Sequence, residues 1–187
     1  MRKLIVTEFI TLDGVIEAPG GEPTHLHTGW AGDFFGPEQM QYKLDEVLEA
    51  EALLLGRVTY EGFSEAWPPR EGPFAEKMNA MPKYVVSTTL TELGWNNSTL
   101  LEGDVPAAVA ELKEGEGGPI LVAGSGTLGR TLIEHDLVDE YRLMVFPVVL
   151  GSGTRLFPDS SDKRTLQLVE TKQFPTGVVV HHYRRAA

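Results

Sequence analysis

The feature that most constrains the fold is a repeated ending, in which three short apolar runs each stop at glycine or hydroxyl residues. The runs are "ALLLG" at 52–56, "KYVVST" at 83–88 and "ILVA" at 120–123, which leads into "GSG". Uninterrupted apolar runs of this length are typical of strands buried on both faces, as in parallel sheets. Because ligands of open α/β sheets bind beyond the carboxyl ends of the strands, the shared ending predicts a ligand site at that edge.

Strand and helix patterns alternate through the rest of the chain. Apolar and β-branched residues predict a first strand over 3–12, which closes at the turn dipeptide Asp13-Gly14. Helices are predicted after Pro37, over 104–113 and after the "GSG" turn. Three further strands are predicted over 140–151, 165–174 and 177–185. Their closeness in the sequence favours some antiparallel pairing, so the expected fold is α/β, with a mixed, mainly parallel central sheet flanked by helices.

Composition limits the classes of function. The chain has no cysteine, which excludes disulfides, zinc–thiolate sites and thiol nucleophiles. Its net charge of −11 argues against broad nucleic-acid binding, which needs basic surface. No apolar run approaches the roughly 20 residues of a membrane span, and the first residues do not form a signal-peptide pattern. We therefore expect a single cytoplasmic domain over 1–187 that binds neither nucleic acid nor membrane.

Gly56 and Arg57 directly follow the first of the apolar runs. Glycine would let the backbone approach a phosphate, and Arg57 would supply a cation beside it. Thr59 has a hydroxyl that could both cap the next helix and bind the phosphate. In the same way, Gly124 and Gly126 remove side-chain bulk from the "GSG" turn, which would suit a pyrophosphate.

The ordered set of motifs resembles the dihydrofolate-reductase-like superfamily. The motifs are "FITLDGVIEAPGG", "ALLLGRVTYEGF", "KYVVST", "ILVAGSGTLGRTLI" and "LVDEYRLMVFPVVLGSGTRLF". The pattern DE-x-R-L…P-x-x-LG-x-G is similar to the branch formed by the C-terminal reductase domain of the bifunctional riboflavin-biosynthesis deaminase/reductase and its stand-alone relatives. The resemblance extends roughly from Lys3 to Tyr183. It implies a three-layer α/β fold with NADPH lying across the strand ends.

The resemblance also implies which residues would hold NADPH. Gly56, Arg57 and Thr59 would meet the cofactor phosphates, and Arg57 with Ser87 and Thr88 would surround the adenosine 2′-phosphate. Ile16 would flank the nicotinamide. The pyrophosphate and nicotinamide side would be wrapped by Gly124, Ser125, Gly126, Thr127 and Leu128.

The candidate catalytic acids are Glu8, Asp13 and Glu38. Folate reductases carry a carboxylate on the first helix, but an ungapped count back from "LLLGR" puts Met40 there, which argues against folate reduction. Strand alternation puts Glu8 on an apolar face, where a raised pKa would let it donate a proton to a C=N bond. The alternative is that Glu8 pairs with an arginine or reaches solvent, and Asp13 has the alternative role of a turn former.

A long loop, rich in glycine and proline, occupies residues 17–37. A loop of this length in a compact domain is usually functional or disordered. Trp30, Phe34 and Phe35 offer flat apolar surfaces that could stack on a heteroaromatic substrate. The alternatives are a hydrophobic anchor for the loop or a dimer contact. Relatives in the riboflavin-type branch pair through their sheets, so a homodimer is expected, with "GVVVHHYRR" as a candidate interface strand.

Metal and hydrolase chemistry receive little support. The two histidines of His25-x-His27 lack a third ligand at fixed spacing, and His181 and His182 point to opposite faces of a strand. We expect no metal site. Ser125 has no partnered histidine at recognisable spacing, which argues against a hydrolase.

The expected function is that of an NADPH-dependent reductase. It would transfer hydride to a C=N or C=O carbon of a small pyrimidine- or pterin-like substrate. One alternative is an enzyme like the riboflavin-pathway 5-amino-6-(5-phosphoribosylamino)uracil reductase, which would need a second phosphate site. The other is a nucleotide-binding protein without turnover. It is considered because Met40 stands where folate reductases carry a carboxylate.

Overall fold

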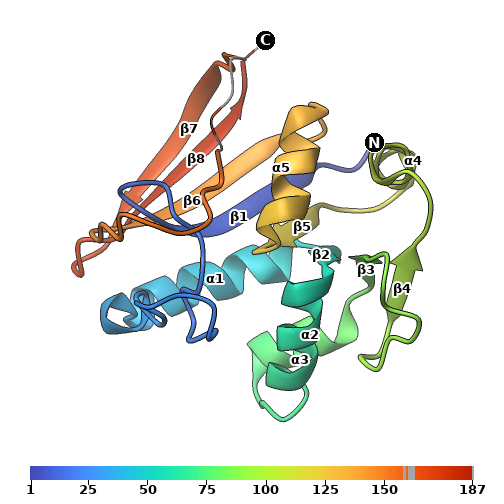
Figure 1. Cartoon of the computed structure of the whole chain (residues 1–187), viewed down its shortest axis with the longest axis horizontal. Coiled ribbons are helices and arrows are strands. Elements are labelled where there is room, and N and C mark those ends of the chain that lie inside the picture. Colours follow the sequence, from blue (N-terminus) through green and yellow to red (C-terminus); the bar gives the residue numbers. More distant parts are fainter. Residues whose placement is uncertain (158, 160–162, 187) are drawn as a thin grey trace.

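A computed structural model describes residues 1–157, 159 and 163–186 of the chain (Figure 1). The helices are η1 (Gly32–Phe34), α1 (Pro37–Glu49), α2 (Arg57–Ala66), α3 (Pro73–Ala80), α4 (Val105–Glu114) and α5 (Gly126–Glu134). The strands are β1 (Leu4–Thr11), β2 (Ala52–Gly56), β3 (Lys83–Val86), β4 (Ser98–Leu101), β5 (Ile120–Ala123), β6 (Glu140–Phe146), β7 (Leu166–Gln173) and β8 (Val179–Arg185). No helix in the described ranges is long and apolar enough to cross a membrane.

The strands form one mixed sheet in the order β4-β3-β2-β5-β1-β6-β8-β7. Pairs from β4 through β6 are parallel, whereas β8 pairs antiparallel with both β6 and β7. The predicted mixed, mainly parallel sheet is therefore confirmed. In Figure 1, α5 lies in front of the sheet and α1 runs below it.

Apolar cores fill both faces of the sheet, because successive side chains of a strand point to opposite sides. Leu54 of β2 belongs to the core beneath α4 and α5. Leu53 and Leu55 belong to the core that also holds Val47 of α1 and Met78 of α3. Burial on both faces explains why β2 is an uninterrupted apolar run rather than an alternating one.

At its carboxyl end, β5 separates from both neighbouring strands. Its pairing with β1 ends at Thr7↔Ala123, while β1 continues beside β6 as far as Thr11↔Phe146. Its pairing with β2 ends at Leu53↔Leu121. The turn that follows β5 therefore lies where the sheet opens, and this opening positions the candidate site.

The strand predicted over 140–151 is shorter in the structure, where β6 ends at Phe146. The next residue is Pro147, which has no backbone N–H to donate to a neighbouring strand. The backbone then turns away to form the loop that faces residues 12–17, to which it is joined by Leu12 N–H donating to Val148 O.

Candidate active site

Two helices begin side by side at the opening. Helix α2 starts directly after β2, and α5 starts after the turn that follows β5. The turns are joined by two hydrogen bonds, in which Gly56 N–H donates to Ser125 Oγ and Ser125 N–H donates to Thr59 Oγ1, both at 2.9 Å. The sequence prediction that Thr59 caps the next helix is wrong, because Thr59 lies within α2 and its hydroxyl accepts from the neighbouring turn.

The start of α5 leaves no space for larger residues. Gly124 and Ser125 both adopt left-handed backbone conformations, with φ of 59° and 63°. A Cβ on Gly124 would lie 3.1 Å from Thr59 Oγ1, and one on Gly126 would lie 2.8 Å from Ile16 Cδ1. The same contacts place Ile16, from the loop after β1, against the first turn of α5. Thr127 and Leu128 complete that turn, and the Leu128 side chain is buried in the core.

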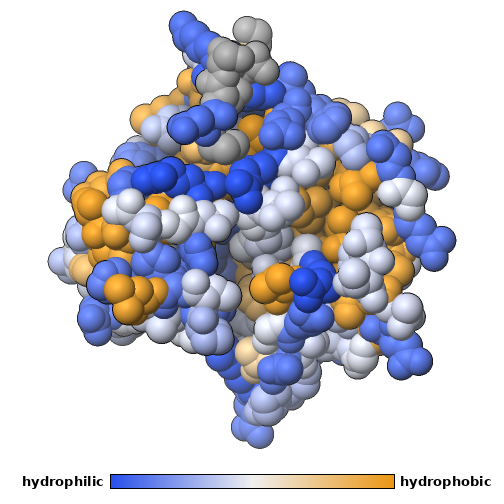
Figure 2. All heavy atoms as spheres, viewed as in Figure 1, coloured by the Kyte–Doolittle hydropathy of each residue, from blue (hydrophilic) through white to orange (hydrophobic). Residues whose placement is uncertain are grey.

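Neither helix start is capped by a side chain within the described residues. The first N–H groups of α2 and α5 therefore remain available, and the positive ends of the two helix dipoles lie close together. Such a pair of helix starts can bind an extended anion such as a pyrophosphate. Figure 2, which has the viewpoint of Figure 1, shows the surface hollowed near its middle, beside the start of α5.

The residues predicted for the adenosine 2′-phosphate lie at the ends of β2 and β3. Arg57 Nη1 is 2.9 Å from Glu61 Oε2, and both side chains are 45% exposed. Ser87 Oγ accepts hydrogen bonds from the N–H groups of Thr89 and Leu90, while Thr88 is exposed. Because β2 and β3 are neighbours in the sheet, the structure brings these three residues to one edge. Their role in binding stays a prediction.

Glu8 is buried at the point where β1 leaves β5, with only 4% of its surface exposed. Its strand neighbours Leu4, Val6 and Ile10 lie in the core beneath α5, which confirms the predicted apolar face. Among the described residues, Glu8 Oε1 has no hydrogen-bond partner. Burial raises the pKa of Glu8 well above its ordinary value, although the charge of Lys43 and the backbone N–H of Gly124 act in the opposite direction.

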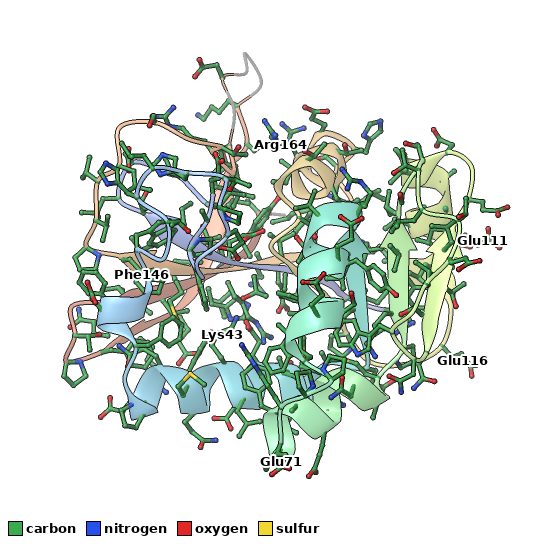
Figure 3. All side chains as sticks on the ribbon, turned by 60° about the horizontal axis from the view of Figure 1, so that its bottom comes forward. Lys43, Glu71, Glu111, Glu116, Phe146 and Arg164 are labelled. Atoms are coloured by element: carbon green, nitrogen blue, oxygen red, sulfur yellow. The ribbon has the colours of Figure 1, made fainter. Side chains whose placement is uncertain are left out.

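On the other face of β1, helix α1 contributes a buried charged group that the sequence reasoning missed. Lys43 Nζ donates to Thr7 Oγ1 at 2.8 Å and to Glu46 Oε2, and Thr7 Oγ1 donates to Glu46 Oε2 at 2.9 Å. Figure 3 shows Lys43 between α1 and the strands. The sequence contained one signal for this group, because Lys43 and Glu46 stand three residues apart on a predicted helix, where opposite charges can pair. The following residue, Val47, packs into the core.

The charged group continues along the sheet through Arg142 of β6. Its Nη1 lies 3.9 Å from Glu46 Oε1, and its two Nη atoms lie 2.8 and 3.2 Å from the two carboxylate oxygens of Glu49. Its Nη2 is also 3.5 Å from Glu140 Oε2, which in turn is 3.1 Å from His182 Nε2. Opposite charges therefore alternate from Lys43 toward the far edge of the sheet, so that each buried charge has a partner.

The other two acids predicted as catalytic occupy different environments. Asp13 accepts hydrogen bonds from the Thr11 hydroxyl at 2.6 Å and from the Leu150 and Gly151 N–H groups at 3.2 and 2.8 Å. These contacts fasten the turn after β1 to the loop after β6, which fits the turn-forming alternative. Glu38 is exposed in the first turn of α1.

The aromatic residues of the long loop pack together against β6. The rings of Trp30, Phe34 and Phe35 lie 5.3, 6.0 and 5.9 Å from the ring of Phe146, measured between centroids. Trp30 Nε1 also donates to Glu17 O at 2.7 Å. These contacts fit the alternative of a hydrophobic anchor. Trp30 and Phe34 nevertheless line a pocket of about 450 Å³ between residues 27–34 and 148–150, so a part in substrate binding stays a prediction.

A second, smaller pocket of about 200 Å³ brings together two arginines that are distant in the sequence. It is lined by Arg130, Gly153, Thr154, Arg155 and Asp159. Arg130 Nε donates to Gly126 O, so this basic pocket adjoins the first turn of α5. Sequence reasoning found no second phosphate cluster, because Arg130 and Arg155 line one pocket only when α5 packs beside the loop after β6.

The described residues contain no group of three or more side chains that could hold a metal ion. His25 Nε2 lies 3.2 Å from Ser152 Oγ, and the rings of His25 and His27 lie 5.8 Å apart.

Two solved structures are similar to this chain over nearly its whole length. The structure is similar to a putative riboflavin biosynthesis protein from Shewanella sp. PV-4, with a TM-score of 0.76, 22% identity and 99% of each chain covered. It is also similar to a pyrimidine reductase-like protein from Corynebacterium diphtheriae, with a TM-score of 0.71, 11% identity, and 100% of this chain and 92% of the other covered. The fold is therefore the dihydrofolate-reductase-like α/β fold, as the resemblance implied.

Sequence comparison defines the family. Residues 2–180 match the RibD C-terminal domain model, so the chain belongs to this reductase-like family. Two Bacillus subtilis (strain 168) relatives span nearly its whole length. The uncharacterized protein YyaP is 33% identical, covering 97% of this chain and 95% of its own length. The uncharacterized protein YwjB is 30% identical, and 98% of each chain is covered.

The contacts of Asp13 generate a prediction about acid stability. Hydrogen bonds from the Thr11 hydroxyl and from the Gly151 and Leu150 N–H groups lower the pKa of Asp13 to about 2. A carboxyl group whose pKa is lower in the folded state than in the unfolded state stabilises the fold at pH values above its unfolded pKa, which is near 3.9. This stabilisation is lost as the pH falls toward 2. We expect Asp13→Asn to lower Tm by about 2–4 °C at pH 7. In scanning calorimetry, the difference from wild type should shrink between pH 4 and pH 2, and a constant difference would contradict this role.

Proposed function

We propose that the chain is an NADPH-dependent reductase that transfers hydride to a C=N or C=O carbon of a small pyrimidine- or pterin-like ring. The observation that carries the proposal is the pair of uncapped helix starts at the opening of the sheet, joined through Ser125 and Thr59. Membership of the reductase-like family supports it.

The residues at the opening fit a dinucleotide. The pyrophosphate would receive hydrogen bonds from the first N–H groups of α2 and α5, neither of which is capped by a side chain among the described residues. Arg57 would leave Glu61 to pair with the 2′-phosphate, and Ser87 and Thr88 would border the same group from the end of β3. Ile16, which contacts the start of α5, would flank the nicotinamide.

The protein's contribution to the chemistry would be orientation and a proton. When bound, NADPH supplies hydride from its nicotinamide C4. Glu8 keeps its proton at a higher pH than an ordinary carboxyl, and its Oε1 has no partner among the described residues. It would therefore donate a proton to the nitrogen or oxygen next to the reduced carbon. The apolar surroundings of Glu8 would exclude water from this transfer.

One observation favours a phosphate-carrying substrate, as in the riboflavin-type alternative. The pocket lined by Arg130, Arg155 and Asp159 adjoins the same end of α5, and a phosphate there would pair with the two guanidinium groups, which outnumber the one carboxylate. Turnover of a phosphoribosylamino-pyrimidine without turnover of its phosphate-free counterpart would support this alternative. Saturable NADPH binding without turnover of any pyrimidine or pterin would support a nucleotide-binding protein instead.

The proposal includes a homodimer formed at the β8–β7 end of the sheet. Nearly all of the edge strand β7 is exposed, and its residues Leu168 and Val169, which lie at a register shift in the pairing with β8, are each 51% exposed. An edge strand with exposed apolar residues is suited to pairing with another chain. Sedimentation equilibrium tests this arrangement, and the mass of a monomer at micromolar concentration would contradict it.

Titration of the purified protein with NADPH and NADH tests the cofactor. We expect saturable quenching of the tryptophan fluorescence, with tighter binding of NADPH. Arg57→Ala should weaken NADPH binding by about tenfold and leave NADH binding unchanged, because only NADPH carries the 2′-phosphate. Arg184→Ala, which removes an exposed arginine on β8, is the matched control. Absence of binding by both nucleotides would overturn the reductase proposal.

The buried state of Glu8 can be tested without a substrate. Because its folded pKa is raised, the folded state holds a proton that the unfolded state releases above about pH 4.3, so stability falls as pH rises from that value toward the folded pKa. Glu8→Gln removes this dependence. Its Tm should therefore increase relative to wild type between pH 4 and pH 7, whereas Glu38→Gln, on the exposed start of α1, should follow wild type.

Once a substrate is found, Glu8→Gln should also reduce the turnover rate by roughly 10²-fold or more. A rate within a few fold of wild type would reject Glu8 as the proton donor. If the difference in Tm between Glu8→Gln and wild type does not change with pH, Glu8 is ionised in the folded protein.

A further inference from the structure

The guanidinium of Arg57 is already paired with a carboxylate of its own helix. Arg57 is the first residue of α2, and its Nη1 donates to Glu61 Oε2, one turn further on, at 2.9 Å. Both side chains are 45% exposed, so the pair lies at the surface. In the part of the chain that the structure describes, this is the one ion pair of Arg57. The cation predicted for the adenosine 2′-phosphate therefore has an anion beside it before any ligand binds.

Stabilisation of the helix does not account well for this pair. The positive end of the α2 dipole disfavours a cation at the first position, and the first turn has no acidic residue to offset it. A carboxylate that follows its basic partner at i+4 is the weaker of the two orders for such a pair. Exposed ion pairs also contribute little to stability. Arg57 is therefore a cation in an unfavourable position, which a bound phosphate would relieve as well as Glu61 does.

The guanidinium cannot serve Glu61 and a phosphate independently. It has five N–H groups, and the contact with Glu61 uses one of them, on Nη1. The other N–H groups could pair with two oxygens of a phosphate. The carboxylate and the phosphate are both anions, however, so they repel each other when they share one guanidinium. A phosphate at Arg57 would therefore either displace Glu61 or bind against its charge.

The pair leaves this edge of the sheet without a net positive charge. The charges of Arg57 and Glu61 cancel, and Ser87 and Thr88, which follow the neighbouring strand β3, bring only hydroxyl groups. A phosphate monoester carries more than one negative charge at neutral pH, whereas a ribose hydroxyl carries none. The carboxylate of Glu61 therefore opposes a 2′-phosphate and has little effect on a 2′-hydroxyl.

We propose that Glu61 determines the cofactor selectivity of the chain by competing with the 2′-phosphate of NADPH for Arg57. This inference rests on the proposed function, because it places the adenosine 2′-phosphate at Arg57. NADH carries a hydroxyl at the same position and does not enter the competition. Glu61 thus narrows the difference in affinity between NADPH and NADH, and the site discriminates between them less than Arg57 alone would.

Titration of three proteins with NADPH and NADH, followed by tryptophan fluorescence, tests the proposal. Glu61→Gln keeps the size of the side chain and removes its charge. We expect it to bind NADPH about two- to fivefold more tightly than wild type, which is the range that exposed ion pairs allow, and to bind NADH unchanged. Glu65→Gln is the matched control, because it removes the same charge from an exposed position one turn further along α2. It should leave both affinities unchanged.

Two further measurements show whether Glu61 acts through Arg57. In the double variant Arg57→Ala/Glu61→Gln the competition is absent, so its affinity for NADPH should equal that of Arg57→Ala. The gain in Glu61→Gln should also shrink as sodium chloride is raised from about 0.02 to about 0.5 M, because salt screens exposed charges. Rearrangement of α2 by the substitution would alter the affinities for NADPH and NADH together and would not depend on salt in this way.

The outcomes separate this inference from the proposed function. Normal binding of NADPH with no gain in Glu61→Gln overturns the inference alone. A gain that is equal for NADPH and NADH, or one that persists in the absence of Arg57, also overturns it, because the carboxylate would then not act by occupying Arg57. Failure of wild type to bind either nucleotide overturns the reductase proposal and this inference with it.

Discussion

The separation of β5 from both of its neighbours is the constraint on which the rest of the site depends. The hydrogen-bond ladders end at Ala123 on one side and Leu121 on the other, so the backbone that follows is free to adopt the left-handed turn at Gly124 and Ser125. That turn directs α5 back over the sheet beside the start of α2. Without it, the two helix starts would not share one opening, and an extended anion would have no common binding surface.

Charge is distributed unequally on the two sides of this opening. On the α5 face, Glu8 is a single carboxyl among apolar side chains, and burial favours its neutral form. On the α1 face, Lys43 and Glu46 are a charged pair, and Arg142 extends the alternation of charge. Strand β1 thus carries a proton-holding group on one side and faces a fixed cation of α1 on the other. A reductase acting on a polar ring needs both a proton and a means of orienting the ring.

The sequence predicted the sheet well where burial leaves a simple pattern, as in "ALLLG" and "ILVA". It did not anticipate β4, whose residues are mostly half-buried and do not form an apolar run, or the helix α3. It singled out Glu8 because a carboxyl on an apolar face breaks a clear alternation. Thr59 was assigned a local cap, but its hydroxyl bonds to Ser125, which is distant in the chain.

The sequence by itself determined most of the strands, the helices α1, α4 and α5, the glycine-rich turns at the strand ends and the apolar face that carries Glu8. These features depend on local backbone preference and on side-chain periodicity, which a linear pattern records. Only the tertiary structure decided that Lys43 meets Thr7, that Arg130 and Arg155 line one pocket, and that the aromatic residues of the long loop pack on Phe146. Contacts of this kind join residues far apart in the chain, and they are fixed by how the helices and loops pack against the sheet, which no local pattern contains.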